Sequence, residues 1–83
     1  MFYVYLLKSP VTDQIYIGYS ADLKARLEGH RKEAPQKEWQ LVYYEAYRDE
    51  HDARERERKL KSYGSALHNL KSRIGRTLNI PRV

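Results

Sequence analysis

Hydrophobic and polar positions near the N-terminus alternate with the period of a β-strand. Over residues 2–7, one face would carry Phe2, Val4 and Leu6, and the other would carry Tyr3, Tyr5 and Leu7. A period of two, together with β-branched and aromatic residues, predicts a strand. A turn is indicated by the serine, proline and aspartate of KSPVTDQ, and a second short strand by QIYIGYS. The short connection between the two strands predicts a β-hairpin.

The register of this hairpin decides which side chains meet. We expect a four-residue loop that is closed by a pair between Lys8 and Asp13. This register places Tyr5 opposite Tyr16, and opposed side chains in a hairpin are about 5 Å apart. The aliphatic residues would then line one face of the sheet and the two phenols the other.

A helical period follows the hairpin. We expect a helix over residues 22–32 that is capped by Ser20 or Asp22, with Leu23, Leu27 and His30 on one stripe. A polar loop with a proline comes next, and the composition of WQLVYYEAY predicts a third strand.

Two more helices are predicted after the third strand. The segment DEHDARERERKLKSYG has acids in its first turn, bases in its last turn, and Gly64 as a stop. We expect Ser65 to cap the last helix, whose apolar stripe consists of Leu67, Leu70, Ile74 and Leu78.

The predicted order is therefore β-β-α-β-α-α, which belongs to the α+β class. We expect a three-stranded antiparallel sheet flanked by helices. A chain of 83 residues allows one domain with a modest core. We assign this domain to residues 1–78 and treat residues 79–83 as a C-terminal tail.

Composition excludes several kinds of chemistry. The chain has no cysteine, which rules out disulfides, zinc-thiolate sites and thiol nucleophiles. The N-terminal apolar run has no basic segment before it and no small-residue cleavage site, unlike a signal peptide. No apolar run approaches the about 20 residues that a membrane span needs. We therefore expect a cytoplasmic protein without membrane contact.

The positive charge is concentrated in the C-terminal part. The chain has a net charge of +5, and residues 58–83 hold seven basic residues and no acid. Residues 1–57 hold all eleven acids and nine basic residues. This asymmetry fits a polyanionic partner bound by the C-terminal part, and fits a solubilising basic helix equally well.

Several residues of the hairpin and the first helix are candidates for a functional site. Tyr5 and Tyr16 would share a sheet face, although tyrosines also pack well in any strand. Gly18 lies on that same face, where a glycine marks close approach of a ligand or backbone, or a bend. Arg26 and His30 are one helical turn apart, so their ends would emerge near the tyrosines or simply lie exposed.

Glu57 is an unusual residue for its position. It lies between Ala53 and Leu60 on the inward stripe of a helix that is otherwise covered in charge. A carboxylate there should be paired or should bind a cation. A salt bridge to Arg26 and a Mg²⁺ site are the two alternatives, since Mg²⁺ is often held by one or two carboxylates with waters and phosphate oxygens.

This combination of residues resembles the GIY-YIG nuclease family, in particular its small stand-alone members, from Phe2 to about Leu78. The second half of the family motif is intact, and the first half is Tyr-Val-Tyr, with its terminal tyrosine kept. The residues that carry the resemblance are, in chain order, Tyr3-Val4-Tyr5, Tyr16-Ile17-Gly18, Arg26, His30 and Glu57.

The resemblance implies an endonuclease that hydrolyses phosphodiester bonds in DNA with Mg²⁺ or Mn²⁺. Glu57 would bind the metal, Arg26 would meet the non-bridging oxygens, and Asn69 would support the site. Tyr5 or Tyr16 would deprotonate the attacking water, with His30 relaying the proton and with Arg26 and the metal lowering the tyrosine pKa.

Nucleic-acid binding is expected from phosphate contacts and without a base-reading element. DNA structure would then matter more than DNA sequence, and a protein partner could supply targeting. A nucleic-acid-binding module without catalysis and a protein-interaction domain that docks through residues 50–62 are the alternatives. The residues expected to contact nucleic acid are Gly18, Arg58, Lys61, Lys71, Arg73 and Arg76.

Overall fold

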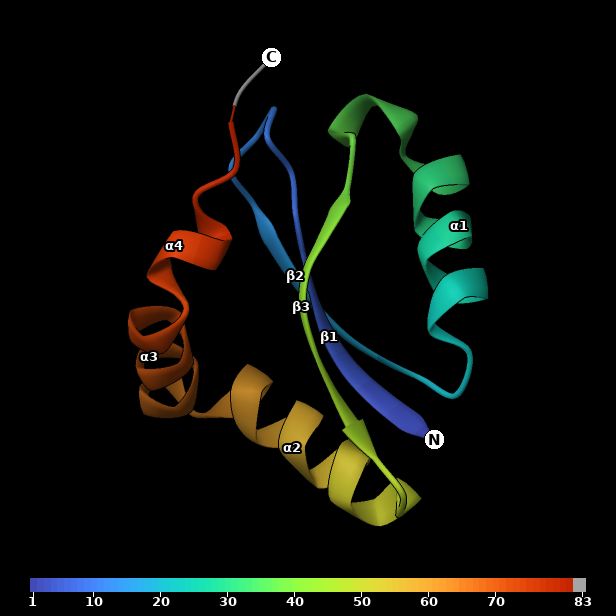
Figure 1. The fold of residues 1–83 in the computed structure, drawn as a ribbon, viewed down its shortest axis with the longest axis vertical. Coiled ribbons are helices and arrows are strands. Elements are labelled where there is room, and N and C mark those ends of the chain that lie inside the picture. The colour runs from blue at the N-terminus through green and yellow to red at the C-terminus, as the bar shows by residue number, and fades with distance from the viewer. Residues whose placement is uncertain (82–83) are drawn as a thin grey trace.

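A computed structural model describes residues 1–81 and confirms the predicted α+β class (Figure 1). Its sheet consists of β1 (Phe2–Lys8), β2 (Ile15–Ser20) and β3 (Gln40–Tyr47), which are antiparallel in the order β2-β1-β3. The helices are α1 (Leu23–Glu33), α2 (Glu50–Ser62), α3 (Gly64–Arg73) and the short α4 (Gly75–Leu78). A 3₁₀ turn, η1 (Pro35–Lys37), connects α1 to β3.

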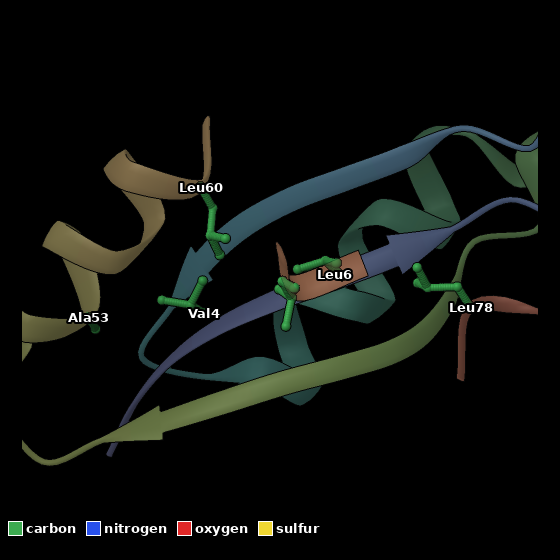
Figure 2. Close-up of a cluster of buried hydrophobic side chains, with 6 residues drawn as sticks. Val4, Leu6, Ala53, Leu60 and Leu78 are labelled. Carbon is green, nitrogen blue, oxygen red and sulfur yellow. The ribbon is translucent and has the colours of Figure 1, made fainter. Parts of the chain in front are cut away.

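The helices cover the two faces of the sheet unequally. Figure 1 shows α1 on one side of the strands and α2, α3 and α4 on the other. The main core lies on the α2 side, where Val4 and Leu6 of β1 pack against helical side chains (Figure 2). These helical residues are Ala53, Leu60, Leu70 and Leu78.

The face toward α1 holds a second, smaller core. Tyr5 and Leu7 of β1 and Trp39 are buried there, with Leu23 and Leu27 of α1 packed against them. The alternation of β1 thus divides its side chains between two layers, as the sequence predicts. Because β1 is the central strand, both sets are fully buried.

The predicted register of the hairpin is wrong by two residues. Tyr5 pairs with Gly18 instead of Tyr16, and Tyr16 pairs with Leu7. The cause is a loop displaced by one residue along the chain, in which the Ser9 N–H donates to the Gln14 carbonyl at 3.0 Å and four residues, 10–13, lie between them. A shift of two keeps each residue on its predicted face, since side chains alternate with a period of two.

The Ser9 side chain explains why the loop lies at this position. It is completely buried, and its Oγ accepts hydrogen bonds from the N–H groups of Val11 and Thr12 at 3.2 and 3.0 Å. Its hydroxyl also donates to the Lys37 carbonyl at 2.5 Å, which ties the hairpin to η1. The expected partnership of Lys8 and Asp13 survives as an ion pair of 3.1 Å, although these residues do not close the ladder.

The N-terminal caps follow the sequence signals. Of the two residues considered for α1, Asp22 is the cap, and its Oδ1 accepts the Ala25 N–H at 3.1 Å. Ser20 supports this turn by accepting the Asp22 N–H at 2.9 Å. Asp49 caps α2 by accepting the Asp52 N–H.

The C-terminal helices differ from the prediction in three ways. The residue before the first turn of α3 is Tyr63, so Ser65 lies inside the helix and does not cap it. Gly64 begins α3, because the extended backbone of Tyr63 (φ −112°, ψ 107°) already ends α2. The predicted last helix is interrupted at Ile74 (φ −110°, ψ 29°), so Leu78 reaches the core from α4.

A register shift in β3 changes which side chains face α1. Leu6 pairs with Tyr43 whereas Leu7 pairs with Leu41, so Val42 is an extra residue opposite β1. Such a bulge lets Val42 and Tyr43 both pack toward the α2 side. Leu41 packs in the core under α1 as a result.

The predicted tail begins directly after α4. Residues 79–81 follow the helix, and residues 82 and 83 lie outside the described residues. Within residues 1–81, none of the helices combines the length and the apolar character that crossing a membrane would require.

Candidate active site

A hydrogen bond between Tyr5 and His30 joins the central strand to α1. The Tyr5 hydroxyl oxygen lies 2.9 Å from Nε2 of His30. Tyr5 is fully buried because β1 is central, and His30 is 9 % exposed because it continues the inward stripe of Leu23 and Leu27. The predicted meeting of hairpin and helix therefore occurs at these two residues.

Aromatic rings surround this pair. The Tyr16 ring makes an edge contact with the imidazole of His30, with centroids 4.6 Å apart, and lies 6.3 Å from the ring of Tyr5. The ring centroid of Trp39 lies 6.3 Å from that of Tyr16, and Trp39 is 8 % exposed. Sequence reasoning gave Trp39 no role in the site, and the available signal was its position as the single tryptophan before the third strand.

Gly18 makes room for the ring of Tyr5. A β-carbon at position 18 would lie 2.3 Å from both Cζ and the hydroxyl oxygen of Tyr5. Gly18 is itself buried beneath that ring. The close approach at Gly18 thus comes from a side chain of the same protein, and the expected contact of Gly18 with nucleic acid stays a prediction.

Arg26 is the cationic member of the cluster. It is exposed one helical turn before His30, and polar interactions with Tyr5 and then Tyr16 raise the pKa of its guanidinium. The guanidinium therefore lies near both phenols. The structure thus brings together four of the six residues expected to bind metal or to act in catalysis, namely Tyr5, Tyr16, Arg26 and His30.

The pKa of Tyr5 is raised, contrary to the expectation that Arg26 would give a net decrease. Burial is the largest cause, because it disfavours the phenolate. The interaction with Arg26 does lower the pKa, but it is outweighed, and the nearby Tyr16 and the charge of Glu57 raise the pKa further. Tyr5 is therefore a neutral phenol at neutral pH in the protein without bound metal.

His30 is shifted toward its neutral form. Burial lowers the pKa of the imidazole, and the positive charge of Arg26 lowers it again, while Glu33 acts more weakly in the opposite direction. A neutral imidazole has one donor and one acceptor nitrogen. When Nε2 is the acceptor, the Tyr5 hydroxyl donates to it and the ring is ready to take a proton.

Glu57 belongs to α2. Its side chain is 22 % exposed, and its Oε2 lies 3.0 Å from Nζ of Lys61 on the same helix. The ion pair of Glu57 is therefore with Lys61, not with Arg26 as one alternative supposed. Its charge nevertheless raises the pKa of Tyr5, which links the carboxylate electrostatically to the phenol.

The Glu57 carboxylate suits a hard cation that takes few ligands from the protein. Over residues 1–81, no group of three His, Cys, Asp or Glu side chains gathers around one point. Mg²⁺ does not require such a cage, since it commonly takes one or two carboxylates with waters and phosphate oxygens. Glu57 is thus a chemically suitable single protein ligand for Mg²⁺ or Mn²⁺.

The remaining predicted residues lie on α2, α3 and α4. Asn69 is exposed on α3, and its supporting role stays a prediction. Arg58 pairs with Glu55, and Arg73 donates to the Tyr43 hydroxyl at 3.3 Å. The exposed cations of the C-terminal helices lie on the side of the sheet away from α1 (Figure 1), and they are Lys71, Arg73 and Arg76.

The fold and the cluster together define a small α+β domain whose hairpin tyrosines meet an arginine and a histidine of the following helix. The family model described as the GIY-YIG catalytic domain matches residues 1–69. The chain belongs to the GIY-YIG family, and its fold is of the nuclease type. Members of this family are endonucleases that act on nucleic acid. Searches among curated proteins and among solved structures gave no match.

Proposed function

We propose that this protein is a metal-dependent endonuclease that hydrolyses phosphodiester bonds in DNA and selects DNA structure over sequence. The observation that carries the proposal is the buried hydrogen bond between Tyr5 and His30, with the guanidinium of Arg26 near the same phenol. A phenol, a neutral imidazole and a guanidinium in one cluster can handle both the proton and the negative charge of phosphodiester hydrolysis.

Arg26 would bind the phosphate. Its planar guanidinium can donate two parallel hydrogen bonds to the non-bridging oxygens, and its charge favours the negative charge that develops there during attack. Because Arg26 is exposed on α1, a phosphate group can reach it from solvent.

Tyr5 and His30 would remove the proton of the attacking water. The raised pKa of Tyr5 argues against a standing phenolate. A relay avoids this difficulty, because the Tyr5 oxygen can take the water proton while the Tyr5 hydroxyl proton moves to Nε2 of His30. Tyr16 would hold the imidazole in place through its edge contact.

Glu57 would hold Mg²⁺ or Mn²⁺. A bound divalent ion supplies Lewis-acid stabilisation of the negative charge on the leaving oxygen. The ion pair with Lys61 would hold the Glu57 carboxylate in position on α2. Binding of the metal would release Lys61, which can then contact a phosphate.

The positions of the cations support a preference for DNA structure. Arg26 lies on the α1 side of the sheet, whereas Lys71, Arg73 and Arg76 lie on the α3–α4 side. A substrate that contacts both must pass around the sheet. A branched or flexible DNA can follow such a path at a lower deformation energy than a straight duplex.

Cleavage assays with matched variants test this proposal. Nicked, branched, single-stranded and double-stranded DNA would be incubated with Mg²⁺ or Mn²⁺ and with a chelator. We expect metal-dependent cleavage that falls at least about 100-fold in Glu57→Gln. Glu55→Gln, which changes an exposed ion-paired carboxylate of the same helix, is the control and should retain activity. Equal cleavage by the two variants would disprove the role of Glu57.

Binding without cleavage is the second candidate function. The exposed cations of α3 and α4 favour it, because they lie away from the cluster and can bind phosphate by themselves. It predicts DNA binding that weakens steeply between about 50 and 200 mM salt while all substrates stay intact.

A further inference from the structure

A hollow lies beside α1, and none of the residues that line it belongs to the cluster of Tyr5, Tyr16, Arg26 and His30. Its volume is about 540 Å³, which is within the usual range for a small-molecule or nucleotide site. It lies between the N-terminal half of α1 and the strands β1 and β3. The side chains that matter for its chemistry are Tyr3, Tyr44, Leu23, Leu27, Leu41 and Lys24.

Two tyrosines form an open aromatic wall of this groove. The rings of Tyr3 and Tyr44 make an edge contact, with centroids 5.9 Å apart and an angle of 67° between their planes. Tyr44 is 53 % exposed, unlike Tyr5 on the neighbouring strand, which is fully buried. An aromatic face left open in this way can stack on a flat ligand.

The floor of the groove is apolar. Leu23 and Leu27 reach it from α1, and Leu41 reaches it from β3. Leu41 faces this side because of the bulge at Val42. A flat ring can therefore slide over aliphatic carbon and meet the face of Tyr44.

The rim of the groove carries one lysine, Lys24, and one aspartate, Asp22. Lys24 lines it and forms no ion pair among the salt bridges of residues 1–81. Asp22 also lies at the rim, but its Oδ1 is engaged by the Ala25 N–H in capping α1. A ligand with a flat apolar ring and an anionic group would match both the wall and the rim.

We propose that this groove binds an unpaired nucleobase of the DNA strand, with the base stacked on Tyr44 and its phosphate near Lys24. The proposal rests on the proposed nuclease function and names its substrate class. Base-to-aromatic stacking is tolerant of sequence, since each base has a π-face. It agrees with a site that has no evident base-reading element.

The position of α1 connects the groove to the cluster. Lys24 and Arg26 are two residues apart, so they project from nearly opposite flanks of the helix. A helix with its side chains is about 10–12 Å across. One strand that crosses the N-terminal half of α1 can therefore place a phosphate at Arg26 and a nearby base in the groove. An apolar peptide or a second protein copy would not use both cations.

The proposal predicts a preference for DNA with a single-stranded segment beside the cut site. A paired base is held in its duplex and cannot turn into the groove without the cost of unstacking. Flaps, gaps and branch points offer such a base at lower cost. Straight duplex DNA would contact Arg26 while leaving the groove empty.

Fluorescence with 2-aminopurine tests the groove independently of catalysis. A short oligothymidylate with one 2-aminopurine would be titrated with the full chain in a chelator, so that cleavage plays no part. We expect binding to quench the fluorescence, and Tyr44→Ala to weaken binding about tenfold and to abolish the quenching. Tyr44→Phe keeps the ring and should behave as wild type.

Tyr63→Ala is the matched control, because Tyr63 is 51 % exposed and lies between α2 and α3. Equal binding and quenching by Tyr44→Ala and Tyr63→Ala would overturn the groove as a base site. A change of oligomeric state in Tyr44→Ala with unchanged DNA binding would overturn it too, in favour of a second copy as occupant. Loss of cleavage alone, with the quenching intact, would instead count against the nuclease function and leave the groove supported.

Discussion

The ring of Tyr5 lies directly over Gly18 of the adjacent strand, at the place where any other residue would have its β-carbon. The gap that this β-carbon would leave to the Tyr5 hydroxyl oxygen is 2.3 Å, far less than a van der Waals contact. The pair Tyr5–Gly18 thus sets the height of the phenol below α1, and with it the hydrogen bond to His30. The glycine acts by what it lacks, since the backbone at position 18 does not have a positive φ.

Gly18→Ala should displace the buried Tyr5 ring. We expect a loss of about 1–3 kcal/mol in the free energy of unfolding, as for other overpacked cores, together with a large loss of DNA cleavage. Urea unfolding measures the first effect and a nuclease assay the second. Gly29→Ala is the control, because nothing lies within 4 Å of its new β-carbon, and it should stabilise α1 by about 0.5–1 kcal/mol. Equal stability of the two variants would contradict the packing role of Gly18.

Acid should destabilise the protein through His30. Burial and Arg26 lower the pKa of His30 in the folded state, so the unfolded chain takes up this proton at a higher pH than the native protein does. The free energy of unfolding should therefore fall as the pH drops below about 6.5, the ordinary pKa of histidine.

Urea unfolding at about pH 7.5 and about pH 5.5 measures this effect, since this interval spans the ordinary histidine pKa. The variant His30→Gln, whose amide can still pair with Tyr5, should lose less stability over the same interval. If wild type and variant lose equal stability, the imidazole of His30 is not the group responsible.

A polar network on the α2 side of the sheet should contribute to stability and not to catalysis. Arg56 donates to both oxygens of Glu45, at 3.0 and 3.1 Å, and the hydroxyls of Tyr43 and Tyr47 donate to the same carboxylate. Burial, as the largest cause, and then the interaction with this carboxylate raise the pKa of Tyr47 to about 12.

Removal of Arg56 should leave the half-buried Glu45 without its countercharge. We expect Arg56→Ala to cost about 1–3 kcal/mol of unfolding free energy. Arg54→Ala is the control, because the Arg54–Glu50 pair lies on the same helix with side chains 60 % and 48 % exposed. The control should cost under about 1 kcal/mol, as surface pairs do. A similar cost for both arginines would mean that Glu45 is not sheltered from water in solution.

The cations of α3 and α4 should govern affinity without affecting sequence preference. We expect each of Lys71→Gln and Arg76→Gln to weaken binding to different DNA sequences by similar factors, and to lower the slope of log K against log salt by about 1 for a lost phosphate contact. Lys32→Gln, at the end of α1, serves as the control. Anisotropy titrations at several salt concentrations measure the slope, and an unchanged slope in both α3–α4 variants would exclude these residues from the DNA interface.

The division of side chains between the two layers could be predicted from sequence because it depends only on local periodicity. Alternation in β1 assigned Val4 and Leu6 to one face and Tyr5 and Leu7 to the other, and both cores agree. The spacing of Arg26 and His30 allowed both to lie near the phenols or to lie exposed, and the structure brings both near the phenols.

The register could not be predicted, because it depends on one buried hydroxyl. Ser9 receives two backbone N–H groups and donates to η1, which lies 28 residues further along the chain at Lys37. Nothing local distinguishes this serine from an exposed turn residue. The role of Gly18 was missed for the same reason, since the two-residue shift is what brings Tyr5 opposite it.

The pKa of Tyr5 depends more on its burial than on its charged neighbours. The sequence indicated a nearby arginine, and the structure has one, but burial of the central strand outweighs it and raises the pKa of the phenol. The groove beside Tyr44 could not be predicted from the sequence either, because its floor requires the bulge that turns Leu41 toward α1.

Because of the bulge at Val42, deletion of this residue has a different effect from deletion of another residue of β3. Loss of a residue from a strand ordinarily transfers all side chains on one side of the cut to the wrong layer. Removal of Val42 would instead join Leu41 and Tyr43 into an uninterrupted ladder with β1, and both would keep their present layers. Length variation among related chains should therefore be tolerated at this point of the strand sooner than at its neighbours, and lineages can gain or lose the residue without rebuilding the sheet.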